Sequence, residues 1–307
     1  MNTVAALIRS LRPKQWIKNL ILYAGWLFSL GERAFEWSNE LALFGRATWA
    51  FAVFCLLSSS IYLFNDIMDV RADRLHPVKR KRPIASGALP IPLAACTSVV
   101  LLAAGLAAAF TINAGFAAAA VTYFVLVTLY SLALKRVPIL DSMIIAFGFV
   151  LRAIAGALAV EVAISVWLVV CTIFLALFLG FAKRRSELVT LGDAAANHRD
   201  ILALYSVGFL DLLITICCTL AVISYSLYSI SSHAMSVFGP DALLTLPFVF
   251  FGVFRYLYLV VLENRGEDPA TLLLHDYQLL GAVILWIAVS TILLTLKPGL
   301  LNNVLVQ

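Results

Sequence analysis

Nine long apolar runs fill most of this sequence and limit what it can fold into. Most of these runs approach the roughly 20 residues that an α-helix needs to cross a bilayer. The chain is also only 13% charged, about half the charged fraction of an ordinary soluble domain. We therefore predict an all-α integral membrane protein, a polytopic bundle of nine transmembrane helices that forms a single domain over residues 1–307, with spans at 16–30, 43–64, 90–111, 114–134, 138–160, 163–181, 203–230, 242–262 and 277–296.

The positions of lysine and arginine predict how these spans are oriented. Short loops rich in these cations stay on the cytoplasmic side of a membrane. With the N-terminus placed in the cytoplasm, most of the 22 lysines and arginines fall on that side. We therefore expect a multi-pass protein of the inner (plasma) membrane, with its C-terminus outside and its active site facing the cytoplasm. The cytoplasmic connections between spans then lie at 65–89, 135–137, 182–202 and 263–276.

Charge, cysteine and histidine content argue against several other functions. The net charge of +5 follows from positive-inside loops and gives no reason to expect nucleic acid as a partner. All five cysteines fall in apolar runs, where cysteine behaves as a small hydrophobe. The four histidines are scattered without the spacing of metal ligands. The sequence therefore indicates neither a disulfide framework nor a zinc site.

The most polar stretch, "NDIMDVRADRLHPVKRKRP" at 65–83, begins at the predicted cytoplasmic end of the second span. Asp66, Asp69 and Asp73 follow an i, i+3, i+7 spacing, which places three carboxylates on one helical face. Such a cluster is unfavourable without a cation, and Mg²⁺ is commonly held by a few carboxylates together with substrate phosphates. We predict that these residues bind Mg²⁺ as a cofactor and act in catalysis.

The basic half of the same stretch offers partners for phosphate oxygens. Pro77 and Pro83 end the predicted helix. Lys79 and Arg82 lie between the two prolines, and we predict that they bind substrate. The alternative for these cations is a solvated loop that only sets the topology of the protein.

The stretch "NDIMDVRADR", which begins at Asn65, resembles the NDxxDxxxD motif of the UbiA-type intramembrane prenyltransferases. The helix count, the polar loops on one side and the position of the motif agree with this family. Its members are nine-helix proteins that bind a diphosphate through Mg²⁺ held by such aspartates. The resemblance implies a UbiA-like fold over nearly the whole chain, with Asn65 among the substrate-binding residues.

The second acidic motif of that family, a DxxxD with a preceding tyrosine, would fall at "YSLALKRVPILD", where this chain departs from the pattern. Asp141 is present, but Val137 stands four residues earlier, where an aspartate is usual. Lys135 and Arg136 lie beside it instead. The resemblance implies a catalytic role for Asp141 and a substrate-binding role for Tyr130. Lys135 and Arg136, as predicted substrate-binding residues, imply a ligand with more phosphate and less metal.

Three other stretches, "LRPKQWIKN" (11–19), "GFVLRAIAGA" (148–157) and "FAKRRSEL" (181–188), are similar to one branch of that superfamily, the decaprenyl-phosphate phosphoribosyltransferases. Members of this branch transfer 5-phosphoribose from phosphoribosyl pyrophosphate (PRPP) to a polyprenyl phosphate and release pyrophosphate. Their product is a precursor of lipid-linked arabinofuranose, used for cell wall arabinan. The resemblance implies a Mg²⁺-dependent transferase whose partners are these two substrates and the lipid bilayer.

Cations inside or next to the predicted spans are further candidate ligands for phosphate. Arg152 lies in the fifth span, and an arginine at membrane depth marks a functional site by default. The alternative for Arg152 is a pairing with Asp141 or a neighbouring helix. Lys183 and Arg184 follow the sixth span, where an i, i+4 ion pair between Lys183 and Glu187 is the alternative. We predict that Arg152, Lys183 and Arg184 bind substrate phosphate.

Two lysines near the N-terminus complete the predicted site. Lys14 and Lys18 are four residues apart and share one helical face. We predict that they recruit the lipid phosphate or the phosphorylated donor. Anchoring of the segment at lipid headgroups is the alternative.

The chemistry of phosphoribosyl transfer is compatible with these residues. A lipid phosphate is mostly anionic near pH 7, because its second pKa is about 6, so the reaction needs no strong general base. We therefore expect direct displacement at the anomeric carbon with inversion.

One rival function is an aromatic prenyltransferase that uses a polyprenyl diphosphate. A transporter is the second rival, although secondary transporters place their sites at midplane breaks between repeats. The sequence leaves the lipid chain length and homo-oligomer formation open.

Overall fold

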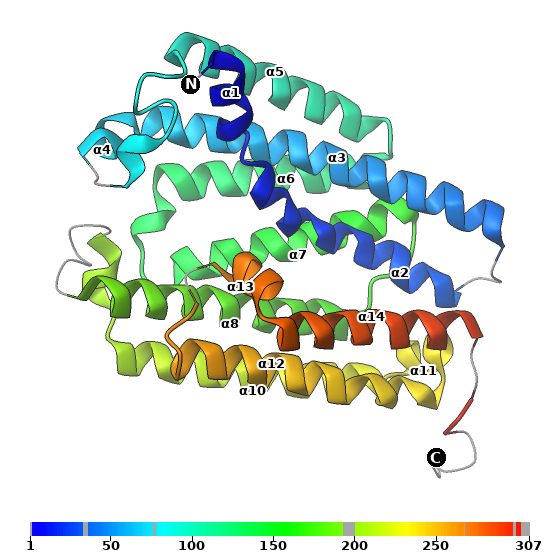
Figure 1. The fold of residues 1–307 in the computed structure, drawn as a ribbon. Helices are drawn as coiled ribbons and strands as arrows, with labels where there is room; N and C mark the ends of the chain where they lie inside the picture. The colour runs from blue at the N-terminus through cyan, green and yellow to red at the C-terminus, as the bar shows by residue number, and fades with distance from the viewer. Residues whose placement is uncertain are drawn as a thin grey trace.

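The structure, a computed structural model, describes residues 2–32, 36–75, 78–192, 200–266, 268–296 and 299–301. Within these ranges the chain is built from helices and contains no strand (Figure 1). Eight helices are long and apolar enough to cross a membrane, as predicted for a polytopic all-α protein. They are α3 (Trp37–Met68), α5 (Ile91–Phe110), α6 (Ala114–Leu132), α7 (Leu140–Val160), α8 (Val166–Leu191), α10 (Val207–Ser229), α12 (Leu246–Val261) taken together with the 3₁₀ turn that precedes it from Pro240, and α14 (Tyr277–Leu296).

The first predicted span is a broken segment and not one α-helix. The chain runs from α1 (Thr3–Ser10) into the 3₁₀ segment η1 (Pro13–Leu22) and then into α2 (Tyr23–Glu32). This segment packs closely against α7 at Gly156, where the absence of a side chain permits the approach. A Cβ added at Gly156 would lie 2.2 Å from the Leu22 carbonyl oxygen. The nine predicted spans therefore correspond to eight long helices and this broken segment.

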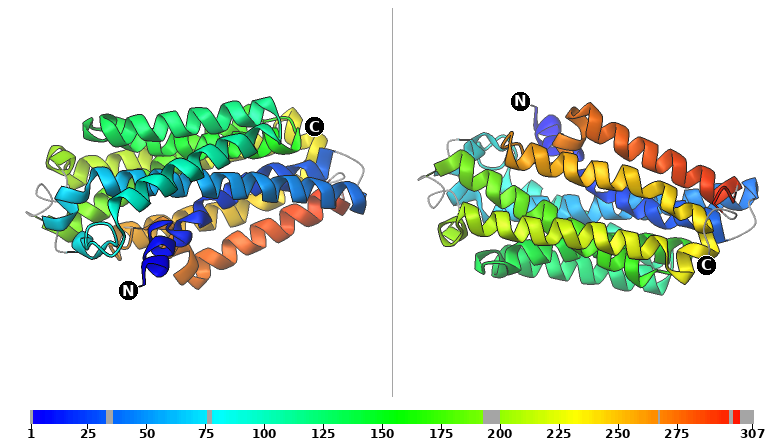
Figure 2. Two further views of the ribbon diagram at one scale, coloured as in Figure 1. Left: turned by 90° about the horizontal axis from the view of Figure 1, so that it is seen from above. Right: turned by 90° about the horizontal axis from the view of Figure 1, so that it is seen from below.

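The long helices lie side by side in an elongated bundle with short elements around its ends (Figures 1 and 2). One end, called the charged end below, carries Asp66, Lys135 and Lys183. The opposite end holds α11 (Ser232–Phe238) and η6 (Pro240–Thr245). The short elements that connect helices at the charged end are α4 (Val70–Leu75), η2 (Lys79–Lys81), η3 (Leu134–Arg136), η5 (Asp200–Leu204) and α13 (Pro269–His275).

Two apolar clusters form most of the core that positions the site. One cluster joins η1, α3, α6 and α7 around Phe54 and Phe116, and several of its other members are alanines. Small residues let membrane helices approach closely. The other cluster joins α8, α10 and α12 around Phe178 and Leu210. A large cavity is lined by η1, α3, α6 and α7 together with α8 and α13, so it lies between the elements of these two clusters.

Candidate active site

Two of the three predicted metal-binding aspartates form a close pair at the charged end. Asp66 on the last turns of α3 and Asp73 on α4 are both buried. Arg82 donates from Nη1 to both carboxylates, at 3.1 Å to Asp66 Oδ1 and 2.7 Å to Asp73 Oδ2. One guanidinium nitrogen therefore lies between two buried carboxylates, a position that suits a cation.

Asp69 lies apart from this pair. It caps the C-terminus of α3 with φ −89° and ψ 4°, so the regular helical spacing ends before Asp73. The Asp69 side chain is 43% exposed, and Lys135 Nζ lies 3.4 Å from its Oδ1. Among the described residues no three acidic, histidine or cysteine side chains gather as a metal site would require. The expected single face of three carboxylates is thus not formed, because the helix breaks at Asp69.

Arg12 is a partner of Asp66 that the sequence analysis missed. It donates from Nη2 to Asp66 Oδ1 at 2.5 Å, and its guanidinium carbon lies 4.9 Å from the centre of the Tyr62 ring. The Arg12 backbone has a positive φ of 54°, which is uncommon for a residue with a side chain. The signal in the sequence is its position in "LRPKQWIKN", next to Lys14 and Lys18.

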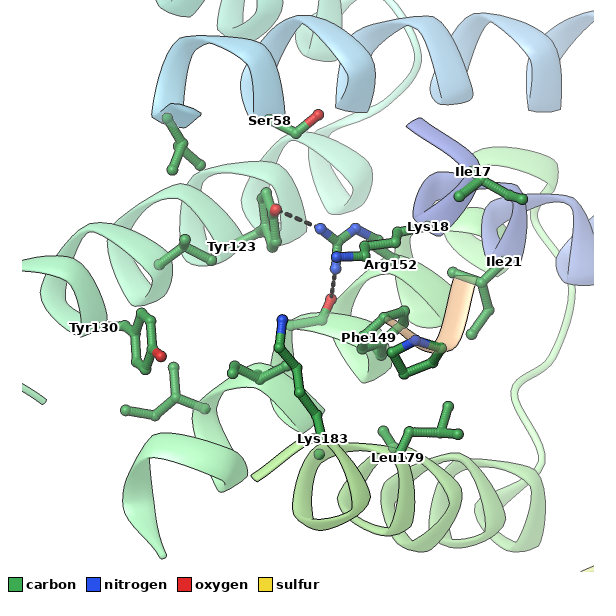
Figure 3. A pocket seen from close by; sticks show the side chains of 18 of the residues that line it. Ile17, Lys18, Ile21, Ser58, Tyr123, Tyr130, Phe149, Arg152, Leu179 and Lys183 are labelled. Atoms are coloured by element: carbon green, nitrogen blue, oxygen red, sulfur yellow. Dashed lines mark hydrogen bonds between the residues drawn. The ribbon is translucent and has the colours of Figure 1, made fainter. Parts of the chain in front are cut away.

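A cavity of about 440 Å³ occupies the centre of the charged half of the bundle. Lys18 on η1, Arg152 on α7 and Lys183 on α8 line it, and Figure 3 shows these cations reaching in from three elements. Most of the remaining lining is apolar or aromatic. No acidic residue is among the described residues that line this cavity. The arrangement therefore favours an anion held against an apolar wall.

Arg152 is the most deeply placed of these cations. Its Nε donates to Asn19 Oδ1 at 2.8 Å, Nη1 to the Gly148 carbonyl at 3.0 Å and Nη2 to the Tyr123 hydroxyl at 2.6 Å. Its guanidinium carbon also lies 4.5 Å from the centre of the Tyr123 ring (Figure 3). All these partners are neutral, and no ion pair among the described residues includes Arg152. A buried cation held only by neutral groups is set to bind an anion.

Lys183 and Tyr130 also line the large cavity, as their predicted roles require. The Lys183 Nζ lies 4.0 Å from Glu187 Oε1. Lys183 therefore both lines the cavity and lies near Glu187. Its predicted role in binding substrate phosphate and the alternative of a helical ion pair are compatible.

Asp141 and Arg184 bind each other and line neither of the cavities described here. Arg184 donates from Nε to Asp141 Oδ2 at 2.7 Å and from Nη1 to Glu187 Oε2 at 2.7 Å. Its side chain is only 1% exposed. The structure thus contradicts the alternative pairing of Arg152 with Asp141. It also places Arg184 and Asp141 as a link between α7 and α8, so their contact with substrate stays a prediction.

Tyr205, which precedes α10, is a second residue that the sequence analysis missed. Its hydroxyl donates to Asp141 Oδ1 at 3.0 Å and accepts a hydrogen bond from the Ile139 backbone N–H at 2.6 Å. Burial raises the pKa of Tyr205 to about 12. The hydroxyl therefore stays protonated near neutral pH and keeps donating to Asp141.

A second, smaller cavity of about 190 Å³ lies beside the large one. Asp69, Ser131, Lys135 and Arg136 contribute its polar lining. Asn65 lines both cavities, and its Oδ1 is buried without a hydrogen-bond partner. Such an unpaired oxygen is unusual in a native structure and indicates a position for a bound ligand or ion.

Two of the predicted substrate-binding lysines lie away from both cavities. Lys14 is exposed at the start of η1, and Lys79 is half-buried on η2. Arg82, which is also outside the cavity linings, contacts the aspartate pair instead. The structure therefore gathers Lys18, Asn65, Tyr130, Lys135, Arg136, Arg152 and Lys183 around two adjoining cavities, with Asp66, Asp73 and Arg82 next to them.

A comparison of the sequence with models of known protein families shows to which family the chain belongs. The model of the UbiA prenyltransferase family matches residues 22–280. The chain belongs to the UbiA prenyltransferase family. It is therefore an integral membrane protein, and the predicted resemblance is confirmed.

Curated members of the UbiA family narrow the resemblance to one branch. The chain is 34% identical to the decaprenyl-phosphate phosphoribosyltransferase of Mycolicibacterium smegmatis over 295 residues, which cover 93% of this chain and 91% of that protein. It is 33% identical to the enzyme of the same name from Mycobacterium tuberculosis H37Rv, with 94% of this chain and 93% of that protein covered.

Solved UbiA structures show the same fold. A UbiA homolog from Archaeoglobus fulgidus, bound to GPP and Mg²⁺, superposes with a TM-score of 0.72 at 18% identity and covers 94% of this chain and 99% of its own. A structure of the homolog bound to Cd²⁺ gives a TM-score of 0.69 with the same coverage. Divalent cations are thus bound in solved structures of this fold.

Proposed function

We propose that this UbiA family member transfers a 5-phosphoribosyl group from PRPP to a polyprenyl phosphate and releases pyrophosphate. The observation that carries this proposal is the large cavity, which Lys18, Arg152 and Lys183 line with no acidic residue among its described lining residues. The decaprenyl-phosphate phosphoribosyltransferases that match over more than nine-tenths of the chain support the same activity.

The apolar lining of the large cavity suits an acceptor that is a lipid. Ile17, Ile21, Phe149 and Leu179 line the same cavity on one side of the three cations (Figure 3). A phosphate at the head of an isoprenoid chain presents an anion and apolar carbons side by side, which is the same combination. Arg152, a buried cation whose hydrogen-bond partners are neutral, would be costly in such a setting without an anion, so we infer that Arg152 binds the acceptor phosphate and that Lys18 and Lys183, which line the same cavity, help to orient it.

The residues around Asp66 and Asp73 fit a divalent cation. The two buried carboxylates share one cationic nitrogen of Arg82, and the Asn65 amide oxygen next to them is buried without a partner. Mg²⁺ commonly takes one or two carboxylates and completes its coordination with substrate phosphates. We infer that Asp66, Asp73 and Asn65 would hold Mg²⁺, and Asp69 stays a predicted ligand. When bound, Mg²⁺ would neutralise charge on the leaving pyrophosphate.

The transfer itself needs little from the protein beyond positioning. One oxygen of the acceptor phosphate forms a bond to the anomeric carbon as the bond from that carbon to pyrophosphate breaks, and the electron pair leaves with pyrophosphate. The acceptor is already anionic near pH 7, because its second pKa is about 6. Arg12 and Arg82, which contact the aspartates here, would be available to phosphate oxygens in the loaded site. We expect inversion at the anomeric carbon.

The site would face the cytoplasm of a cell with this protein in its inner membrane. The support is the positive-inside rule applied to the loops that meet at the charged end. In a cysteine-free background, Lys79→Cys should be shielded from membrane-impermeant thiol reagents in intact cells. Trp37→Cys, at the exposed start of α3 on the opposite end, should be labelled. Labelling at 79 in sealed cells would invert this orientation.

The test of the function is a transfer assay with purified protein. Mg²⁺, PRPP labelled in the ribose and a long-chain polyprenyl phosphate should give a labelled, acid-labile product that extracts into organic solvent, with one pyrophosphate released per label. An aromatic prenyltransferase is the alternative, supported by the family and by the Asp66–Asp73 pair. Prenylation of an aromatic acid from a polyprenyl diphosphate, with no ribose label in the lipid phase, would establish that alternative.

A further inference from the structure

The small cavity presents a second set of anion-binding groups. Lys135 and Arg136, both on η3, line it, whereas Lys18, Arg152 and Lys183 line the large cavity. Asn65 is the residue that the described linings of the two cavities have in common. Two adjoining cavities with separate cations and one shared wall suit two phosphorylated groups that meet at that wall.

The cations of the small cavity are only weakly neutralised. Lys135 Nζ lies 3.4 Å from Asp69 Oδ1, a long contact to a carboxylate that is itself partly exposed. Arg136 is exposed, and no ion pair among the described residues includes it. Val137, which follows, stands where an acidic side chain was expected. The positive charge of this loop is therefore available to a ligand.

The loop that carries these cations is held in a defined conformation. Ile139 has φ 67° and ψ −49°, and the Leu140 N–H donates to the Pro138 carbonyl at 2.7 Å. These values describe a γ-turn of the rare positive-φ type, which is strained for a β-branched residue. The Ile139 N–H donates to Tyr205, which also binds Asp141. The buried Asp141–Arg184–Tyr205 cluster thus anchors the loop beside the cavity.

We propose that the small cavity is the subsite for the 5-phosphate of the donor, a phosphate monoester, and that the large cavity receives the phosphate of the lipid acceptor. This assignment rests on the proposed function. The small cavity carries mostly polar or charged groups beside a short apolar edge, which suits a water-soluble sugar phosphate. The large cavity has an apolar wall, which suits a lipid. The ribose would then lie near Asn65, between the two sites.

The test compares two donors, PRPP and ribosyl 1-diphosphate, which lacks the 5-phosphate. We expect the wild-type protein to favour PRPP in kcat/KM by on the order of 100-fold or more, because charged hydrogen bonds to phosphate are strong. The double variant Lys135→Gln/Arg136→Gln should lower kcat/KM for PRPP by a similar factor. Its use of ribosyl 1-diphosphate, and its KM for polyprenyl phosphate, should change by less than about threefold.

Two further variants complete this experiment. Lys135→Arg/Arg136→Lys keeps both charges and should recover most of the preference for PRPP, which separates lost charge from lost folding. Arg80→Gln, at an exposed cation of η2 outside both cavities, is the matched control and should behave as wild type.

The possible results distinguish this assignment from the function on which it rests. If the double variant raises the KM for polyprenyl phosphate and keeps the preference for PRPP, the two cavities are assigned the wrong way round. If the double variant keeps both the KM for polyprenyl phosphate and the preference for PRPP of the wild type, the small cavity is not a phosphate subsite. If wild-type protein labels lipid from neither donor, the proposed function fails and this assignment fails with it.

Discussion

The two acidic regions of the site differ in how their aspartates are paired. Asp66 and Asp73 share Arg82, whose side chain is 29% exposed. Asp141 pairs with Arg184, whose side chain is 1% exposed, and Tyr205 binds its other oxygen. Both regions hold a buried carboxylate beside arginine, but one arginine reaches water and the other does not.

This difference indicates a division of labour between the two regions. A partly exposed arginine can leave its carboxylates and be solvated, so under the proposed function a metal ion would take its place at the Asp66–Asp73 pair. A fully buried ion pair cannot open without leaving a charge unpaired, which is strongly unfavourable. We therefore interpret Asp66 and Asp73 as the exchangeable cation site and Asp141 as part of a fixed support for the cationic loop.

The largest effect is expected at the exchangeable pair. Asp66→Asn removes a charge that a bound divalent cation needs, so the transfer rate should fall by on the order of 10³-fold. For the same reason, EDTA should abolish turnover of the wild-type protein. The folded fraction in detergent should be unchanged, as measured by size-exclusion chromatography. Glu36→Gln, an exposed acid at the opposite end, is the control. Undiminished transfer in Asp66→Asn would remove the metal site.

The second effect concerns stability and the fixed support. Arg184→Met leaves Asp141 buried without its cation and should lower the free energy of unfolding by about 3–5 kcal/mol. The double variant Asp141→Asn/Arg184→Met leaves no charge at position 141 and should recover much of this loss, whereas Glu187, which loses Arg184 in both variants, keeps Lys183 nearby. Denaturant unfolding in detergent measures both. A stable Arg184→Met protein with a raised KM for either substrate would instead make Arg184 a substrate ligand, as the sequence alone predicted.

The sequence was sufficient to predict those parts of the fold and of the site that depend on one continuous stretch of the chain. The apolar runs predicted the membrane bundle, because each crossing is a continuous stretch of residues. Asp66 and Asp73 were candidates because they belong to one short acidic motif, in which only seven positions separate them. Arg152 was a candidate because a charge within an apolar run is costly. In each case the energetic reason can be stated from one segment alone.

The remaining parts of the site depend on contacts between distant segments. Arg12 meets Asp66 across 54 positions, Tyr205 meets Asp141 across 64, and Asn19 meets Arg152 across 133. No local pattern marks these partners, because helix packing brings them together. The break of α3 at Asp69 was missed for a related reason. An i, i+3, i+7 spacing assumes a continuous helix, and the helix here ends at Met68.

A moderate effect is expected when an acid is restored to the second motif. Val137 is 45% exposed, so Val137→Asp should fold. Its carboxylate would compete with phosphate for Lys135 and Arg136, and kcat/KM for PRPP should fall about tenfold, equivalent to about 1.4 kcal/mol. Val137→Asn introduces a side chain of the same shape without charge and should stay within about twofold of wild type. Equal losses in the two variants would attribute the effect to shape and not to charge.

The smallest effect is expected at Tyr205, which connects the fixed support to the cationic loop. Tyr205→Phe removes the hydrogen bond to Asp141 and leaves the Ile139 N–H without its acceptor, so stability should fall by about 1–2 kcal/mol. A looser loop should also raise the KM for PRPP about threefold while the KM for polyprenyl phosphate stays constant.

Because burial raises the pKa of Tyr205 to about 12, the wild-type hydroxyl remains a donor from about pH 6 to about pH 9. The ratio of the two KM values for PRPP, variant over wild type, should therefore stay constant across that range. A ratio that falls toward one at the upper end would mean that the hydroxyl ionises there. A change confined to the lipid KM would show that Tyr205 supports the large cavity and not the loop.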